Sequence, residues 1–175
     1  MRRRHPPIPA LWLMTDERMG EAVWTALTRL PRGGGVVVRH YGLDARVRRE
    51  FVRKVAKVAR KNRLQLVIAG GNQGVSGTGV HNRRGSRAAL KTASAHNRRE
   101  AVAAARAGAD AVFVSPVFAT RSHPGARTLG PVRFGLMVRG LGIPVIALGG
   151  MNAKRARRLR ALGASGWAAI DAWLN

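Results

Sequence analysis

Cysteine is absent from the sequence, which excludes disulfide bridges and thiolate metal sites. Aromatic residues make up only 5% of the chain, a small share for the stacking platforms on which single-stranded nucleic acids bind. Long apolar runs are missing behind the basic start, where the stretch Leu11–Met14 stands alone. A secretory signal needs about 7–15 apolar residues and a membrane span about 18 or more. We expect a soluble, cytoplasmic protein with a flexible basic arm over residues 1–10 and one domain over residues 11–175.

Acidic residues are scarce as well: eight stand against 32 basic ones, so the formal net charge is +24. With so few carboxylates, an oxygen-rich metal site is hard to assemble, and no residue is assigned as a metal ligand. One interpretation of the positive charge is a phosphate-rich partner, either nucleic acid or a phosphorylated metabolite. The other is a solvated surface on which charge keeps the protein in solution. The basic residues are spread over several predicted helix faces, which favours the second interpretation.

What the sequence does contain is a regular alternation of strand and helix patterns. Strands are predicted over residues 11–15, 36–38, 64–69, 78–81, 92–94, 111–114, 143–148 and 167–170. Helices are predicted over residues 17–30, 83–90, 97–107 and 153–162, after Pro131, and around an apolar stripe of Val47, Phe51, Val55 and Val58. Eight such units without a hairpin signal indicate a parallel sheet, closed as a single compact (β/α)₈ TIM barrel of the α/β class. An open doubly wound sheet is the alternative, if the thin unit over residues 78–90 is not real.

Polar residues gather after the predicted strands, where a parallel barrel places its chemistry. Gly149 and Gly150 end an apolar strand and open a helix, an arrangement that offers bare N–H groups to an anion. Arg39 ends a buried strand, where a charge needs a partner and a phosphate is a suitable one. Other candidates are Tyr41, Asn72, Ser94, Thr120, Ser122, His123, Arg127 and Asn152, together with Asp16, His81, His96, Arg121 and Asp171. Asp16 and Asn152 have a simpler interpretation as helix caps, and His81 as a packed core residue.

Several sequence words resemble the thiamine phosphate synthase / TenI superfamily, in order and in spacing. They are Ser94-Ala95-His96, Gly108-Ala109-Asp110, Ser115–Thr120, Ile143–Ala147 and Gly149-Gly150, with weaker matches at Leu11–Asp16 and Gly79-Val80-His81. The resemblance implies a barrel that joins a pyrimidine pyrophosphate to a thiazole phosphate, with Mg²⁺ holding the departing pyrophosphate. It implies that Arg39 binds pyrophosphate, that Ser94 lies beside the pyrimidine, and that Thr120 and Ser122 line the thiazole side. Gly149-Gly150 would cradle the thiazole phosphate, and His123 stands where the family has a pyrophosphate-binding lysine.

The chain departs from the family pattern at the positions that should bind magnesium. Gly70-Gly71 replaces the Asn-Asp pair after the third strand, which displaces Asn72, and Asn82-Arg83-Arg84 replaces the acidic residues after the fourth. Tyr41 stands where the family has a basic residue. Three hypotheses follow: a magnesium-dependent synthase, a metal-free TenI-like thiazole tautomerase with His123 as proton-transfer group, and a non-catalytic binder of a phosphorylated ligand or nucleic acid. The sequence leaves the oligomeric state open, with a homodimer as one option.

Overall fold

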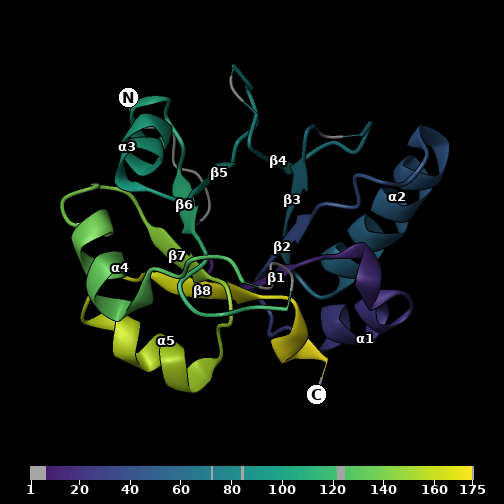
Figure 1. Ribbon diagram of the computed structural model, residues 1–175. Helices are drawn as coiled ribbons and strands as arrows, with labels where there is room; N and C mark the ends of the chain where they lie inside the picture. The colour runs from purple at the N-terminus through teal and green to yellow at the C-terminus, as the bar shows by residue number, and fades with distance from the viewer. Residues whose placement is uncertain (1–6, 72, 84, 122–124, 175) are drawn as a thin grey trace.

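The computed structural model describes residues 7–71, 73–83, 85–121 and 125–174. Eight parallel strands pair in sequence order, and β1 pairs with β8 to close a barrel (Figure 1). The strands are β1 (Leu11–Met14), β2 (Gly35–Val38), β3 (Gln65–Ala69), β4 (Gly79–His81), β5 (Lys91–Ala95), β6 (Ala111–Val114), β7 (Val145–Leu148) and β8 (Gly166–Ala169). The predicted barrel is therefore confirmed, and the open-sheet alternative is wrong.

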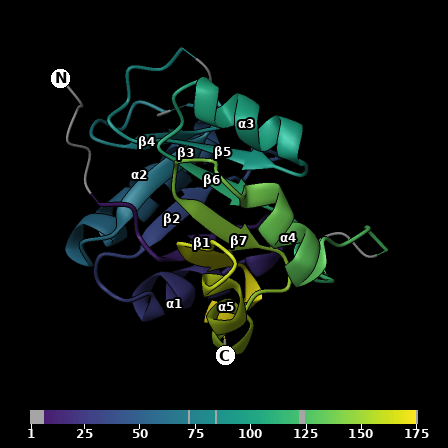
Figure 2. The same cartoon turned by 90° about the vertical axis from the view of Figure 1, so that its left-hand side faces the viewer.

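Five α-helices flank the barrel in the described part of the chain. They are α1 (Ala22–Arg29), α2 (Ala45–Lys61), α3 (Arg98–Arg106), α4 (Gly130–Val138) and α5 (Ala153–Arg160), with short 3₁₀ turns η1 (Glu17–Met19) and η2 (Asp171–Trp173). Figure 1 shows α2 and α3 on opposite sides, with the loops after β3 and β4 between them, and Figure 2 shows α3, α4 and α5 following one another around the barrel.

Two helix predictions need correction. The helix expected over residues 17–30 is interrupted at Gly20, whose φ of +49° ends η1 before α1 begins. The helix expected over residues 83–90 is wrong, because the described residues there form turns and extended chain. Gly85 has a φ of +66°, and only Leu90 in that stretch is a buried apolar residue. Without a repeating apolar face, the segment has nothing to pack as a helix. The predicted strands are correct, but no helix follows β3 or β4 among the residues that the structure describes there.

The predicted apolar stripe of α2 is confirmed at three of its four positions: Val55 is buried, and Phe51 and Val58 pack against the same core cluster, whereas Val47 is 43% exposed. Arg48 is buried as well. Its Nε donates to the His40 carbonyl at 3.0 Å, and its Nη2 donates to the Arg39 and Ala69 carbonyls at 3.1 and 2.7 Å. This buried guanidinium ties the end of β2 to the end of β3, and so helps to shape the barrel mouth.

The barrel interior is filled by apolar side chains from β1, β2, β3, β6, β7 and β8. Trp12 and Phe113 meet edge to face, with ring centroids 5.2 Å apart. Gly35 on β2 lies against the Trp12 ring so closely that a Cβ there would overlap it. The other two apolar clusters fill the space between the strands and the helices.

The segment before β1 closes the amino end of the barrel. The Pro9 carbonyl accepts from Trp12 Nε1 at 2.6 Å, and the Ala10 carbonyl accepts from the Trp167 amide at 2.8 Å. Of the arm expected over residues 1–10, residues 1–6 lie outside the described part of the chain, and residues 7–10 carry these contacts; the division at residue 10 stays a prediction. Among the described residues, none belongs to a helix with the length and apolar character that a bilayer span requires.

Candidate functional site

A cavity of about 660 Å³ opens at the carboxyl ends of the strands. Eleven of the candidates named from the sequence line it: Arg39, Tyr41, His81, Ser94, His96, Thr120, Arg121, Gly149, Gly150, Asn152 and Asp171. They lie at or after the ends of β2, β4, β5, β6, β7 and β8, so these strand ends share one mouth. Arg127 is exposed and is not among the lining residues. Asn72, Ser122 and His123 lie outside the described residues.

The turn between β7 and α5 depends on its two glycines. Gly149 and Gly150 have φ values of +95° and +58°, in the region that only glycine adopts readily. The loop after β6 packs directly on them: the Phe118 amide donates to the Gly149 carbonyl at 3.1 Å, and a Cβ on Gly149 would lie 2.8 Å from Pro116 Cα. Asn152 caps α5, since its Oδ1 accepts from the Arg155 amide at 2.9 Å. The cap interpretation of Asn152 is therefore confirmed, and the same residue lines the cavity.

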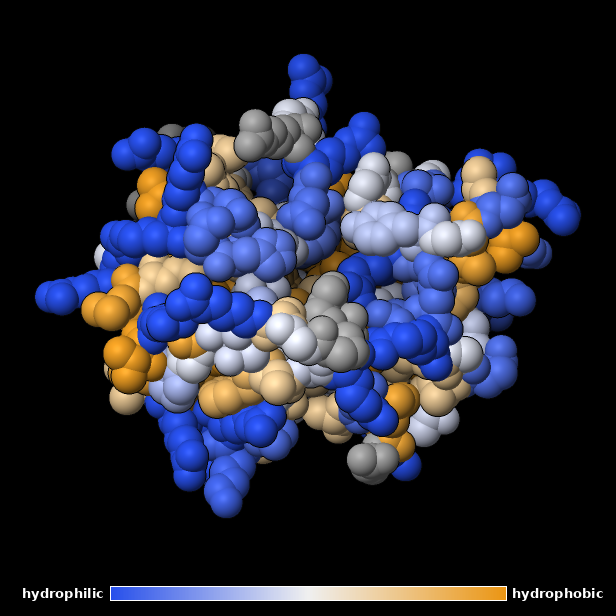
Figure 3. Space-filling view, viewed as in Figure 1, coloured by the Kyte–Doolittle hydropathy of each residue, from blue (hydrophilic) through white to orange (hydrophobic). Residues whose placement is uncertain are grey.

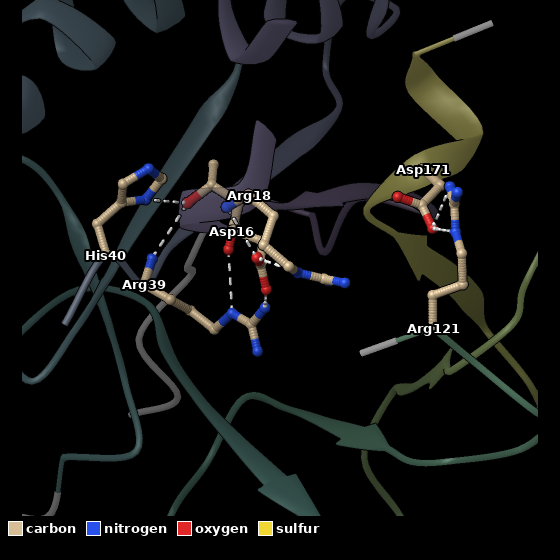
Figure 4. Close-up of polar contacts among 7 residues, drawn as sticks. Asp16, Arg18, Arg39, His40, Arg121 and Asp171 are labelled. Atoms are coloured by element: carbon tan, nitrogen blue, oxygen red, sulfur yellow. Dashed lines mark hydrogen bonds and ion pairs between the residues drawn. The ribbon is translucent and has the colours of Figure 1, made fainter. Parts of the chain in front are cut away.

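Arg39 has a carboxylate partner in this structure. Its Nη2 lies 2.7 Å from Asp16 Oδ2, and its Nε donates to the Thr15 carbonyl at 3.0 Å (Figure 4). Asp16 also accepts from the Arg18 amide at 3.1 Å, which makes it the cap of η1 as expected, and from Arg18 Nε at 2.7 Å. Burial raises the pKa of Asp16, but the hydrogen bonds from Arg18 and the charge of Arg39 outweigh it and hold the pKa below its ordinary value.

A second arginine–carboxylate pair crosses the mouth. Arg121, on the loop after β6, places its Nη2 and Nε 3.0 and 3.2 Å from Oδ2 of Asp171, which follows β8 (Figure 4). The two side chains are 78% and 42% exposed, so water screens this pair and leaves it weak. A ligand with more negative charge than a carboxylate can therefore displace Asp171 from Arg121 at little cost in free energy.

The floor of the cavity holds a hydrogen-bonded chain of three side chains. His81 Nε2 lies 2.9 Å from Ser94 Oγ, and His81 Nδ1 lies 2.9 Å from Thr92 Oγ1. Burial, together with the smaller effect of the charge of Arg39, lowers the pKa of His81 to about 4. The imidazole is therefore neutral at pH 7 and fixes the Ser94 hydroxyl. Asn82 adds a second anchor, since its Oδ1 accepts from the Ser94 amide at 2.7 Å.

The sequence interpretation assigned no ligand role to Arg155, which also lines the cavity. It is the third residue of α5, and from there it reaches back to donate to the Gly150 carbonyl. Its guanidinium also lies over the Phe118 ring, 4.7 Å from the centroid. The sequence does contain a signal for this role, because Arg155 stands in the first turn of the helix that follows Gly149-Gly150. A side chain in the first turn of a helix lies beside the residues that precede the helix.

The described donors do not suit the magnesium ion that the family resemblance implies. No group of three or more histidine, aspartate or glutamate side chains gathers among the residues that the structure describes. Asp171 is the one carboxylate among the lining residues, and Arg121 occupies it. Asp16 is engaged by two guanidinium groups. Magnesium prefers carboxylate oxygens that are free to coordinate, and both carboxylates after β1 and β8 are instead neutralised by arginine.

The closed strand order and the arginine-lined mouth define a (β/α) barrel protein with a polar cavity at the carboxyl ends of its strands. A family model described as thiamine monophosphate synthase matches residues 79–173, which is more than half of the chain. The chain belongs to the thiamine monophosphate synthase family.

Individual relatives agree with this assignment. A thiamine-phosphate synthase of Geobacillus thermodenitrificans is 42% identical over 81 residues, which are 45% of this chain and 37% of the relative. One of Chloroflexus aurantiacus is 39% identical over 80 residues, again 37% of the relative. The matched region thus spans little more than a third of the length of these relatives. The solved thiamine phosphate pyrophosphorylase of Pyrococcus furiosus has the same fold, with a TM-score of 0.75 at 24% identity over 94% of this chain and 86% of that one.

Proposed function

We propose that this protein joins a hydroxymethylpyrimidine pyrophosphate to a thiazole phosphate, the reaction that gives the family its name. The observation that carries the proposal is the cavity at the carboxyl ends of the strands, where Arg39, Ser94 and the Gly149-Gly150 turn line one space. The cavity volume of about 660 Å³ lies within the range of sites for small organic ligands.

The proposed reaction breaks the bond between the pyrimidine methylene carbon and the pyrophosphate oxygen. Pyrophosphate leaves with the electron pair, and the thiazole nitrogen forms the new C–N bond to the methylene carbon. Charge develops on the leaving oxygen, so cationic donors fixed around it lower the barrier. Arg39 would bind that pyrophosphate, with His123 as a second predicted contact, and Tyr41 would border the same side of the mouth.

The remaining candidates are proposed to hold the two rings. Ser94, fixed by His81, would contact the pyrimidine, while Thr120 and Ser122 would line the thiazole side. The amides of Gly149 and Gly150 and the start of α5 at Asn152 would hold the thiazole phosphate, since a helix start favours an anion. Arg127 and Asn72 stay predictions of ligand contact without a described place in the cavity.

The direct test is product formation from the two substrates at high enzyme concentration. We expect thiamine phosphate and one equivalent of pyrophosphate, detected by chromatography. Arg39→Gln should lower the rate at least about tenfold, because hydrogen bonds to charged groups are worth about 1.5–3 kcal/mol. Arg106→Gln, in the exposed last turn of α3 at the opposite end of the barrel, is the matched control and should leave the rate unchanged. Absence of product with the unmodified protein would reject the synthase.

A thiazole tautomerase is the second candidate, and the poor match of the described carboxylates to magnesium favours it. That reaction moves a proton between two ligand atoms and needs an acid–base group but no metal. His123→Ala should then abolish isomerisation of the thiazole carboxylate phosphate, whereas His96→Ala should not. Equal activity of His123→Ala and the unmodified protein would remove His123 from that role. The cytoplasmic location and the homodimer stay predictions.

A further inference from the structure

The lining of the cavity has an unusual excess of guanidinium groups. Arg39, Arg121 and Arg155 reach it from three elements: the end of β2, the loop after β6 and the first turn of α5. Asp171 is the only acidic side chain among the described lining residues. The two histidines of the lining, His81 and His96, add no negative charge to it. The mouth therefore carries a fixed positive charge supplied by the chain itself.

The two carboxylates near these arginines act as their partners. Asp16 accepts from Arg39 and Arg18, both at 2.7 Å, and Asp171 accepts from Arg121 at 3.0 Å. A carboxylate in such a pair has little capacity left for a cation, whereas the arginine can exchange it for a phosphate oxygen in the same geometry. Asp16 and Asp171 thus hold two guanidinium groups extended at the edge of the cavity.

We propose that Arg39 and Arg121 together bind the pyrophosphate group directly, so that this site takes a diphosphate ligand without a divalent metal ion. The inference rests on the proposed function, because it assigns the charge neutralisation that the synthase reaction requires. On binding, the diphosphate oxygens replace Asp16 at Arg39 and Asp171 at Arg121, while Arg155 stays against Gly150 and Phe118, beside the turn proposed for the thiazole phosphate. The proposal separates this chain from the metal-dependent chemistry that the family resemblance implies.

The first experiment is calorimetric titration of the intact protein with inorganic pyrophosphate, once in EDTA and once in excess Mg²⁺. We expect pyrophosphate to bind in EDTA, with a dissociation constant no larger than the one measured in Mg²⁺. Arg39→Gln and Arg121→Gln should each weaken binding in EDTA by about tenfold or more, as expected for lost hydrogen bonds to a charged group. Arg106→Gln, in the last turn of α3 at the opposite end of the barrel, is the matched control for the lost charge and should change the affinity less than about twofold, because exposed charges far from the site are screened by salt. Thermal melting of each variant checks that it is folded.

The second experiment uses the sign of a change at Asp171. If Asp171 holds Arg121 in place of the ligand, Asp171→Asn frees the arginine and strengthens pyrophosphate binding severalfold. If Asp171 instead coordinates a metal, the same substitution weakens binding in Mg²⁺ buffer. Glu50→Gln makes the same change of charge on the exposed side of α2 and should have no effect.

The outcomes separate the inference from the proposed function. If pyrophosphate binds only with Mg²⁺, or binds more weakly to Asp171→Asn, metal-free binding is rejected and the proposed synthase reaction is unaffected. The same conclusion follows if the protein forms product but does not bind pyrophosphate in EDTA. Absence of both binding and product rejects the inference together with the proposed function.

Discussion

At the scale of single residues, His81 is a buried group whose protonation state the fold controls. It is 2% exposed and packs edge to face on Phe113, with the ring centroids 5.4 Å apart. Its two nitrogens are both engaged, with Thr92 and Ser94. A proton added to this imidazole would be a charge without a carboxylate partner in the described surroundings, which explains why burial lowers its pKa.

This burial predicts how stability depends on pH. The pKa of His81 is about 4 in the folded protein and near 6.5 in the unfolded chain, so the unfolded chain takes up the proton first as the pH falls. The stabilisation is fully present above pH 6.5 and is lost as the pH falls toward 4. Between pH 7 and pH 5 we expect a loss of about 2 kcal/mol in the free energy of unfolding.

The measurement is urea unfolding at pH 7 and at pH 5, with His81→Asn as the comparison. His81→Asn is less stable at pH 7 but should lose much less between the two pH values, since the titrating group is gone. Asp16, Asp44 and Glu100 have lowered pKa values and destabilise the fold only at more acidic pH. An equal loss in both proteins would contradict the assignment.

The sequence predicted which residues meet at the mouth better than it predicted their partners. Arg39 and Ser94 could be placed because they follow apolar strands, and strand ends converge in a barrel. The pairing of Arg39 with Asp16, and of Arg121 with Asp171, depends on side-chain directions in loops, which no periodicity encodes. For the same reason His81 was interpreted as a packed residue, and its hydrogen bond to Ser94 was not foreseen.

At the scale of secondary-structure elements, α2 is held by a charge rather than by apolar contacts alone. Arg48 is 9% exposed and donates to three carbonyls at the ends of β2 and β3. Arg49, the next residue on the same helix, is exposed. The two positions therefore provide an internal comparison between a buried and a solvated arginine.

We expect Arg48→Met to lower the free energy of unfolding by about 3 kcal/mol, because it leaves buried carbonyl groups without donors. Arg49→Met should change it by less than about 0.5 kcal/mol, as is usual for exposed positions. Chemical denaturation of both variants at pH 7 is the measurement. A similar effect at the two positions would show that the carbonyl contacts of Arg48 contribute nothing to stability.

The elements also show where sequence patterns are informative. Apolar strands such as β6 and β7 were located within one or two residues, because few alternatives bury four consecutive apolar residues. The apolar stripe of α2 located Phe51, Val55 and Val58 against the core, but it could not reveal the buried Arg48, because an arginine adds nothing to an apolar pattern. The helix expected over residues 83–90 rested on the alternation of units rather than on a local apolar pattern, and it was wrong.

At the scale of the whole molecule, the net charge of +24 remains the strongest deviation in composition. Figure 3 shows hydrophilic side chains over much of one face, with apolar residues scattered between them. On the described helices the basic side chains are mostly exposed, on α2, α3 and α5 alike. A distribution of this kind raises the electrostatic potential everywhere and favours no particular groove.

We therefore expect weak, sequence-independent association with duplex DNA at low salt, which disappears as salt rises. Fluorescence anisotropy between 50 and 200 mM NaCl measures it, and the affinity should fall at least about a hundredfold. Neutralising three arginines of α5 and three of α2 should weaken it to a similar extent. Affinity that is unchanged across this salt range, or that depends on one helix only, would indicate a dedicated nucleic-acid site.

The seam between β1 and β8 has a consequence for biosynthesis of the protein. Ala10 and Leu11–Leu13 hydrogen-bond or pair with residues 167–169, and Trp173 donates to the Trp12 carbonyl at 3.1 Å. During translation, the edge of β1 that pairs with β8 stays unpaired until β8 has emerged from the ribosome. An unpaired strand edge is a site of mispairing between chains, so the nascent polypeptide should depend on chaperones until β8 has emerged and paired with β1.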